Sequence, residues 1–453
     1  MVTITKDKHV KRGPGRPIFN EHLRAETLAS LAVTDYVSII DSVTAIESIK
    51  ALKPDVYAKG NDYKAKEKDV TGRIYDEEEA IKSVKGRLVF TDDITFSSSK
   101  LINSYLDVFP PRTLKYLKAI AKRYSRDFVI DKLNSLKKLK VLVIGDAIID
   151  QYHYCVPMGK SSKEHLVANR YISEETFAGG ALATANNVAS VCGNVDLITI
   201  LGEKEPFKDF IQSKLSLNVK PKFFSRADTG TIIKRRFVSE GTNRKLFEIC
   251  YMRDDSISKS KETEIMRFLR SKIKGYDLVV ISDFGHGLFT PKIIDFICRE
   301  SKYIALNVQT NSANIGFNLV TKYPRANCVC VDEMELRFAT HDKISDLRQQ
   351  VKQIYEQLNC SQLITTRGPS GSLSYSRDGG FHETPAFSYR VVDAIGAGDA
   401  FFAFVGPCFA AGIPQDLTSF VGNAVGSLAV QIICNREPVK FVDLVKFITR
   451  LLK

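Results

Sequence analysis

The stretch VVDAIGAGDAFFA, Val391–Ala403, decides the fold of this chain. Its apolar lead-in is followed by Gly396, Ala397 and Gly398, and then by an apolar run typical of a helix. Glycines at a strand-to-helix turn let backbone N–H groups converge at the helix N-terminus, where they bind anions and phosphate above all. Asp399 lies in the same turn, where a carboxylate would repel an anion unless it takes a proton from an attacking hydroxyl. The stretch therefore predicts phosphoryl transfer to an alcohol, although a glycine turn taken alone is more often structural.

The composition is that of a globular protein. The chain has 453 residues, 44% of them hydrophobic, which suggests two or three domains. No apolar run approaches the roughly 20 residues of a membrane span, and the N-terminus lacks the apolar core of a secretory signal. The nine cysteines are scattered without a Cys-x-x-Cys pair, so neither a zinc site nor a disulfide framework is predicted. Free thiols in a reducing cytoplasm are the simplest interpretation.

The formal net charge of +13 suits anionic small substrates, nucleic acid or an acidic membrane surface. Much of the charge lies in one basic segment, Arg112–Lys140, in which Leu114, Leu117 and Ile120 recur at helical spacing. We interpret the segment as a solvated connector helix. Nucleic-acid binding is the alternative and is not expected, because no recognised binding module is present. We expect no membrane association.

The patterning divides the chain into three parts. Residues 1–110 alternate short strands with helical stretches, as in an α/β domain. Residues 111–139 form the basic helical connector. Residues 140–453 open with the apolar strand KVLVIGD and continue with apolar strands between helical stretches, which favours a mostly parallel sheet covered on both faces. Ligands of such sheets bind at the carboxyl ends of the strands, where the motifs fall.

The residues DAIGAGDAF, beginning at Asp393, resemble the D-T-x-G-A-G-D signature of ribokinase-like (PfkB) carbohydrate kinases, with Ala394 in place of the usual threonine. The resemblance implies an α/β fold: a ribokinase-like three-layer αβα domain with a small β lid. It also implies ATP-dependent phosphorylation of a sugar or sugar phosphate with Mg²⁺. In this family Asp399 would be the base. Asp393 would lie near a monovalent-cation site, so potassium is an expected second cation.

Further segments fit the same resemblance in the order of the family. Each of their glycines alone would be an ordinary turn, and it is their order along the chain that supports the interpretation. The residues that the resemblance assigns to the sugar are Asp146, Asp150, Gly179, Gly180 and Asp283. Those assigned to the nucleotide are Asn307, Thr366, Gly368 and Gly371. The segment VDEMELR stands in the place of the N-x-x-E magnesium motif, which assigns Mg²⁺ to Glu335 through water.

The segments GDAIIDQYHYCVPMGKSSKE and FAGGALATANNVAS resemble the heptose 7-phosphate kinase half of bifunctional bacterial ADP-heptose synthases. The substrate of that branch already carries a phosphate, and the resemblance assigns this phosphate to Lys160, Lys234 and Arg236. Solvated surface is the alternative for these cations. The chain departs from the family at His286, interpreted as a polar substitute at the pocket rim, and at residues 307–309. The resemblance therefore leaves the identity of the sugar open.

Residues 1–110 resemble the cytidylyltransferase-type half of the same synthases, as an incomplete Rossmann-like nucleotidyltransferase domain with the order of the halves reversed. The family's H-x-G-H motif is not found, and His9 and His22 cannot replace it. We expect a remnant or a shortened gene model without nucleotidyl transfer. The residues that the resemblance places at the nucleotide and its phosphates are Lys59, Asp62, Tyr63, Ser97, Ser98 and Ser99.

These observations predict a cytoplasmic carbohydrate kinase whose partners are ATP and a small anionic sugar, with a homodimer left open as the assembly. The alternatives are a nucleotide-sugar nucleotidyltransferase of the ADP-heptose type, or a nucleotide-binding scaffold without kinase turnover. The intact GAGD sequence together with Glu335 argues against the scaffold.

Overall fold

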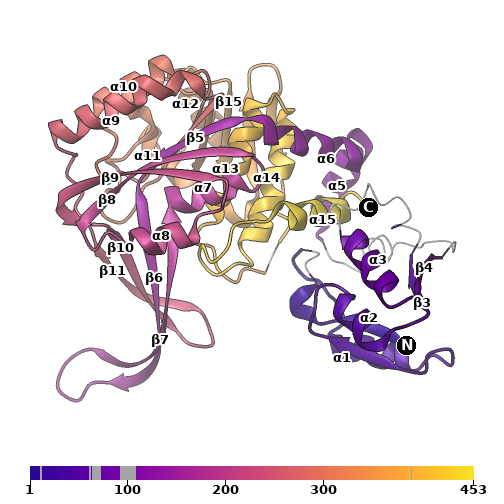
Figure 1. Cartoon of the computed structure of the whole chain (residues 1–453). Coiled ribbons are helices and arrows are strands. Elements are labelled where there is room, and N and C mark those ends of the chain that lie inside the picture. Colours follow the sequence, from indigo (N-terminus) through magenta and orange to yellow (C-terminus); the bar gives the residue numbers. More distant parts are fainter. Residues whose placement is uncertain (11–12, 61–62, 64–72, 92–108, 389) are drawn as a thin grey trace. The chain divides into compact units, whose positions relative to one another are not determined.

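The computed structural model describes residues 1–10, 13–60, 63, 73–91, 109–388 and 390–453. The chain forms two compact units (Figure 1): Met1–Ala121 together with Phe441–Lys453, and Lys122–Lys440. The C-terminal helix α15 (Phe441–Leu451) belongs to the same unit as the N-terminal residues. The unit bounds thus differ from the three ranges expected from the sequence.

A nine-stranded sheet forms the middle of the second unit, in the order β17-β16-β15-β14-β13-β12-β5-β8-β9. The strands from β15 to β9 pair in parallel, and β16 and β17 add an antiparallel edge. The central strands are apolar and buried, as expected where helices cover both faces. The strands are β5 (Lys140–Gly145), β8 (Asn194–Lys204), β9 (Val219–Gly230), β12 (Leu278–Asp283), β13 (Ile304–Val308), β14 (Cys328–Asp332), β15 (Gln362–Thr366), β16 (Ser372–Ser376) and β17 (Gly380–Thr384).

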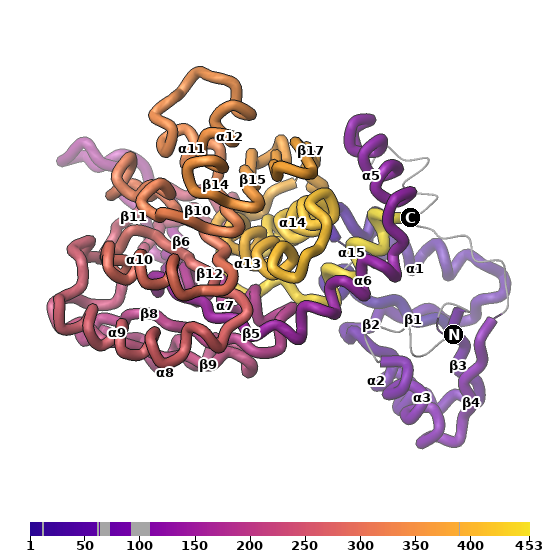
Figure 2. Tube along the Cα trace, turned by 90° about the horizontal axis from the view of Figure 1, so that it is seen from above, coloured from indigo at the N-terminus to yellow at the C-terminus, as the bar shows by residue number. Residues whose placement is uncertain are grey.

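Helices cover this sheet in two layers. Helices α13 and α14 pack side by side (Figure 2), and α13 also contacts α7 and strands β12 to β14. Helices α9 to α12 bury their apolar side chains against the opposite face of the strands. Successive side chains of β13 point to opposite faces of the sheet. Leu306 belongs to the cluster with α9 to α12, whereas Ala305 faces Gly406 of α13. The helices are α7 (Ala181–Ala189), α8 (Lys208–Lys214), α9 (Lys259–Lys272), α10 (Pro291–Glu300), α11 (Glu333–Thr340), α12 (Leu347–Gln357), α13 (Ala397–Ala410) and α14 (Gln415–Ala429).

A second sheet of four strands, in the order β11-β10-β6-β7, forms the lid. Its strands are β6 (Ala147–Lys160), β7 (Val167–Gly180), β10 (Ile232–Ser239) and β11 (Arg244–Tyr251). Strands β6 and β7 form a long antiparallel hairpin, and β10 pairs in parallel with β6. Tyr152, Phe177, Val238 and Cys434 form its small buried cluster. The three-layer α/β fold with a small β lid, expected from the sequence, is confirmed.

The basic connector consists of two helices rather than one. Helix α5 (Pro111–Arg123) ends before Ser125, whose hydroxyl accepts from the Phe128 amide and caps α6 (Arg126–Ser135). The apolar face predicted for the segment is present in α5, where Leu117 and Ile120 are buried. The segment is only partly solvated, since the Tyr124 hydroxyl donates to Asp416 at 2.8 Å.

The first unit contains two small parallel pairs of strands, β1 with β2 and β3 with β4. Ile49, Ala80 and Ile81 form a buried cluster between its helices. The elements are β1 (Val2–Thr5), α1 (Glu21–Ala29), β2 (Val37–Ile40), α2 (Ile46–Leu52), β3 (Val56–Lys59), α3 (Arg73–Ser83) and β4 (Arg87–Phe90). Its nucleotidyltransferase character stays a prediction.

Short 3-10 helices complete the described elements: η1 (Asp7–His9), η4 (Leu136–Lys138), η5 (Ile273–Gly275), η6 (Val320–Lys322) and η7 (Gly368–Ser370). All nine cysteines are free thiols. Among the described residues, the longest apolar helices still fall short of what crossing a membrane requires.

Candidate active site

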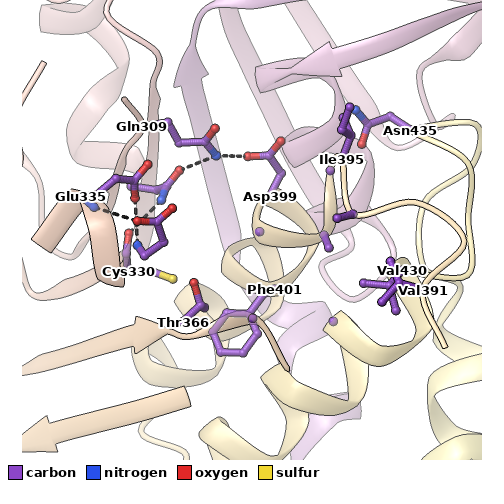
Figure 3. Close-up of a pocket in the computed structure, with 18 of the residues that line it drawn as sticks. Gln309, Cys330, Glu335, Thr366, Val391, Ile395, Asp399, Phe401, Val430 and Asn435 are labelled. Atoms are coloured by element: carbon purple, nitrogen blue, oxygen red, sulfur yellow. Dashed lines mark hydrogen bonds between the residues drawn. The ribbon is translucent and has the colours of Figure 1, made fainter. Parts of the chain in front are cut away.

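A cavity of about 680 Å³ lies within the second unit, lined by the carboxyl ends of β13 to β15, the N-terminus of α13 and the lid (Figure 3). Its size is that of a small-molecule site. It brings together most of the residues assigned from the sequence. Those that line it are Asp150, Gly180, Lys234, Arg236, Asn307, Glu335, Thr366, Gly368, Gly371, Gly396, Ala397, Gly398 and Asp399.

The glycine turn before α13, in which the sequence predicts anion binding, lies at one end of the cavity. Gly396 has φ +82°, and a Cβ there would lie 2.1 Å from Asn435 Oδ1, so this position requires glycine. Within the described part of the chain, the amides of Gly398 and Asp399 have no acceptor, as expected in the first turn of a helix. The Ala397 amide already donates to the Ala394 carbonyl at 3.3 Å. The free N–H donors of the turn are therefore those of Gly398 and Asp399. The Asp399 amide was not predicted from the sequence.

Asp399 is held next to this loop as a buried carboxyl group. Gln309 Nε2 donates to Asp399 Oδ1 at 2.5 Å, and the same amide reaches Asn307 Oδ1 at 3.1 Å. Burial raises the pKa of Asp399 to about 7, and the Asp150 charge adds to this, whereas the Gln309 hydrogen bond and the Lys234 charge oppose it. A pKa near the working pH suits a general base. From the sequence, residue 309 could be recognised only as a departure from the family, because its partner lies 90 residues away.

The lid contributes two cations with different surroundings. Arg236 Nη1 pairs with Asp150 Oδ1 at 2.5 Å, and its Nη2 pairs with Glu248 Oε2 at 2.6 Å. The guanidinium is thus neutralised by two carboxylates. Lys234 is 8% exposed and lines the cavity, yet its ammonium has no ion-pair partner among the described residues. A buried cation without a partner is costly unless an anion binds beside it.

Lys160 lies outside the cavity and does not join these two cations. It ends β6, opposite Val167, ten residues beyond Asp150 along the strand. At the usual rise per residue of a strand this is on the order of 30 Å. The structure therefore does not place Lys160 where it could bind a phosphate in the cavity.

Two more of the residues assigned to the sugar lie outside the cavity lining. Asp146 Oδ2 accepts from the Phe284 amide at 3.0 Å, and burial raises the pKa of Asp146. Asp283 is fully buried and binds Lys322 Nζ at 2.6 Å and the Tyr323 hydroxyl at 2.7 Å. These carboxyl groups hold the loop after β12, rather than line the site.

Gly179 and His286 also lie outside the lining. A Cβ at Gly179 would lie 2.0 Å from Asp150 Oδ2, so glycine leaves room for that carboxylate. His286 is 3% exposed, with Nδ1 2.8 Å from Asp254 Oδ1, and therefore does not lie at a pocket rim as expected.

Glu335 and Asp332 offer carboxylates at the third side of the cavity. Asp332 caps α11 by accepting from the Glu335 amide at 2.7 Å, and Glu335 accepts from the amides of Asp332 and Thr310 at 2.8 and 3.1 Å. Burial raises the pKa of Glu335 to about 8, with Asp332 adding to it. Mg²⁺ takes hard oxygen ligands, commonly one or two carboxylates together with phosphates and waters. This pair fits that need, although among the described residues no group of three or more His, Cys, Asp or Glu side chains could hold a metal alone.

The turn between β15 and β16 forms the end of the cavity that the sequence assigns to the nucleotide. Gly368 and Gly371 have positive φ of +51° and +86°, and a Cβ at Gly371 would lie 2.0 Å from the Thr384 carbonyl. Apolar residues complete the wall here, among them Val391 and Val430. These two valines could not be predicted as lining residues, because a single valine in a loop carries no signal of a binding role. Such a surface suits the faces of an aromatic base.

Asp393 does not offer a free carboxylate to a potassium ion. It lies outside the cavity lining, and Lys245 Nζ is 2.6 Å from its Oδ1. The potassium site expected from the resemblance therefore does not fit the residues present.

In the first unit, Lys59 pairs with Glu77 Oε2 at 2.7 Å, and the Lys59 ammonium lies 4.8 Å from the Tyr63 ring centre. Asp62, Ser97, Ser98 and Ser99 lie outside the described residues.

The fold, the glycine turn and the buried carboxyl group of Asp399 beside it fit a carbohydrate kinase. The chain belongs to the pfkB family of carbohydrate kinases, because the model of this family matches residues 138–434.

Known relatives agree with this assignment. The chain is 26% identical over 303 residues to "Bifunctional protein HldE" of Shewanella baltica (strain OS185), which covers 66% of this chain and 61% of the relative. The chain thus spans about 61% of that relative's length. Among solved structures, it resembles Arabidopsis thaliana ribokinase complexed with ribose and ATP, with TM-score 0.52 and 17% identity over 70% of this chain and 99% of the other. It also resembles Escherichia coli phosphofructokinase-2 in complex with potassium, with TM-score 0.56 and 13% identity over 70% and 100%.

Proposed function

We propose that the chain transfers the γ-phosphoryl group of ATP to a hydroxyl of a sugar that already carries a phosphate, with a heptose 7-phosphate as the favoured acceptor. The observation that carries the proposal is Lys234, a buried ammonium without an anionic partner among the described residues. The acceptor's own phosphate would neutralise it. The HldE relative and the resemblance of the lid segments to heptose 7-phosphate kinases support the choice of sugar.

In the proposed reaction Asp399 takes the proton of the acceptor hydroxyl. The hydroxyl oxygen then forms a bond to the γ-phosphorus, while the bond from that phosphorus to the β–γ bridging oxygen breaks and ADP leaves. The free amides at the start of α13 stabilise the charge on the transferred group, and one such donor is typically worth roughly 2.7–4 kcal/mol. Gln309 orients Asp399 through its short hydrogen bond.

Glu335 and Asp332 would hold Mg²⁺, in part through water, and the ion would neutralise charge on the phosphates of ATP. Asn307 stays fixed at this edge, because its Nδ2 donates to the Cys330 carbonyl at 2.8 Å. Thr366, Gly368 and Gly371 would contact the nucleotide, with Asp150 and Gly180 near the sugar. We place the reaction in the cytoplasm.

We also propose that two copies pair through the lid sheet. Its edge strands leave large apolar side chains exposed, with Tyr171 at 57%, Phe247 at 49% and Tyr251 at 45%. Exposed apolar surface of this kind often marks an interface. Light scattering on a size-exclusion column should give the mass of a dimer, and a monomer at assay concentration would contradict this part.

The test of the acceptor is an ADP-release screen over neutral sugars, hexose 6-phosphates and heptose 7-phosphates. We expect phosphorylated sugars to react at much lower KM. Lys234→Met should raise the KM of the acceptor roughly tenfold or more while leaving the KM of ATP near its original value, because a charge-assisted bond to phosphate is lost. Lys163→Ala, an exposed lysine of the same lid hairpin, is the matched control.

Two results would contradict the proposal. Equal use of neutral sugars would mean that no acceptor phosphate is recognised. A rise in the KM of ATP alone, on replacing Lys234, would mean that this ammonium binds the nucleotide instead.

A further inference from the structure

The carboxylate of Asp393 has all of its acceptor positions filled. It is 3% exposed and lies three residues before Gly396. Its Oδ1 accepts from Lys245 Nζ at 2.6 Å and from the Ile395 amide at 3.1 Å. Its Oδ2 accepts from the Tyr152 hydroxyl at 2.7 Å and from the Cys434 amide at 3.1 Å. Each carboxylate oxygen accepts about two hydrogen bonds, so no lone pair is left for another cation.

The charge of Asp393 is balanced inside the protein. The Lys245 ammonium reaches it from β11 of the lid and also lies 5.2 Å from the centre of the Tyr152 ring. Burial alone would raise the pKa of Asp393, but the hydrogen bonds from Lys245, Tyr152 and the Ile395 amide hold it below its usual value. The carboxylate is therefore ionised and paired with a cation that the chain itself supplies.

We propose that the ammonium of Lys245 is the resident cation of the anion-binding turn, and that this kinase works without a monovalent metal ion. The inference rests on membership of the pfkB family, which the family match establishes, and not on the identity of the sugar. A potassium ion could bind Asp393 only by displacing Lys245, and would then compete with a covalently attached ammonium whose effective concentration is high.

Lys245 is a positioning residue in this scheme. Through Asp393 it fixes the start of the turn, because the Ile395 amide donates to the same carboxylate oxygen. The amides of Val392 and Asp393 also donate to the Val430 carbonyl, at the C-terminal end of α14, at 2.9 and 3.2 Å. The lid strand β11 and the turn that binds phosphate are thus joined by one ion pair.

The experiment compares potassium, sodium and choline chloride at equal ionic strength, using the whole chain. Calorimetry measures the affinity for ATP with Mg²⁺ and needs no acceptor, while ADP release is followed with the acceptor that reacts best. For the unmodified chain we expect affinity and rate to agree within about twofold across the three salts.

Lys245→Met should behave differently from Arg244→Met, which alters an exposed neighbour on the same strand. In choline chloride we expect Lys245→Met to lose roughly tenfold or more in ATP affinity or rate, the size of one charge-assisted hydrogen bond. Potassium should restore much of this loss, and Arg244→Met should remain insensitive to the salt. Rescue by a particular cation is a result that a purely structural role of Lys245 would not give.

The outcomes separate clearly. An unmodified chain that needs potassium for ATP binding or turnover overturns the proposal, and this arm does not depend on any variant folding. Lys245→Met that matches the unmodified chain in choline chloride, or that potassium fails to rescue, overturns the positioning role. If no tested sugar is phosphorylated, the proposed acceptor is wrong, but the ATP-binding series still decides the present inference.

Discussion

Replacing Asp399 by asparagine should remove catalysis and at the same time stabilise the fold. The substitution keeps the shape of the side chain, and the amide oxygen of asparagine can still accept from Gln309. It removes the group that takes the proton, which is typically worth about 10²–10⁴ in rate. It also removes a carboxyl group that is 7% exposed and that the fold disfavours in its charged form.

The size of the stabilisation follows from the pKa of Asp399. The folded protein holds this proton up to about pH 7, whereas the unfolded chain releases it near 3.8. The folded state therefore binds more protons between these values, so its stability falls as the pH rises from about 4 to about 7. Since each pKa unit corresponds to roughly 1.4 kcal/mol, the full penalty is on the order of 4 kcal/mol. Asparagine has no proton to lose and escapes it.

The assay is denaturant unfolding of both proteins at several pH values, beside single-turnover rates. The advantage of Asp399→Asn should grow by on the order of 3 kcal/mol between about pH 5 and about pH 8. Asp295→Asn, an exposed position on α10, should show no such growth. A stability difference that does not change with pH would refute the argument from burial. A variant that keeps more than about a tenth of the rate would refute the role of Asp399 as the base.

Three further predictions concern the same cavity. Gln309→Ala should move the acid limb of the kcat/KM profile to higher pH, because the lost hydrogen bond held the pKa of Asp399 down; a limb that stays in place or moves to lower pH would contradict this. Gly396→Ala should cost roughly 10²–10³ in kcat by displacing the free amides of the turn, whereas Gly275→Ala, in open space, should leave kcat unchanged. Glu335→Gln should raise the Mg²⁺ concentration needed for half-maximal rate about tenfold or more without unfolding α11, since glutamine also serves in a capping box; an unchanged Mg²⁺ requirement would exclude this carboxylate as a ligand.

The features that could be predicted from the sequence are those written in neighbouring residues. The turn at Gly396 and the strands ending in polar residues are local patterns, and both the family and the three-layer fold follow from them. Asp332 and Glu335 are three residues apart and lie together for the same local reason, as a capping box. A parallel sheet then brings the ends of separate strands to one edge, so a list of strand ends already names most of the cavity lining.

The features that could not be predicted depend on partners far away in the chain. Gln309 reaches Asp399 across 90 residues, and Lys245 reaches Asp393 across 148. No local sequence pattern predicts either of these two contacts. The assignment of Lys160 to the phosphate is wrong for a related reason. Strand β6 is long, so its far end lies well away from the site. A resemblance between sequences matches positions along the chain and does not include this distance.

Lys234 and Arg236 show how such partners decide function. The two residues are two apart on β10, so the period of a strand places both side chains on one face. From their spacing alone, the two cations are therefore expected to have the same role. The neighbouring strands separate them, because Asp150 of β6 and Glu248 of β11 both reach Arg236. The positive charge of Arg236 is therefore balanced within the lid. The charge of Lys234 has no such partner among the described residues. We therefore expect an anion in this cavity to bind Lys234, while Arg236 holds Asp150 in place for the sugar.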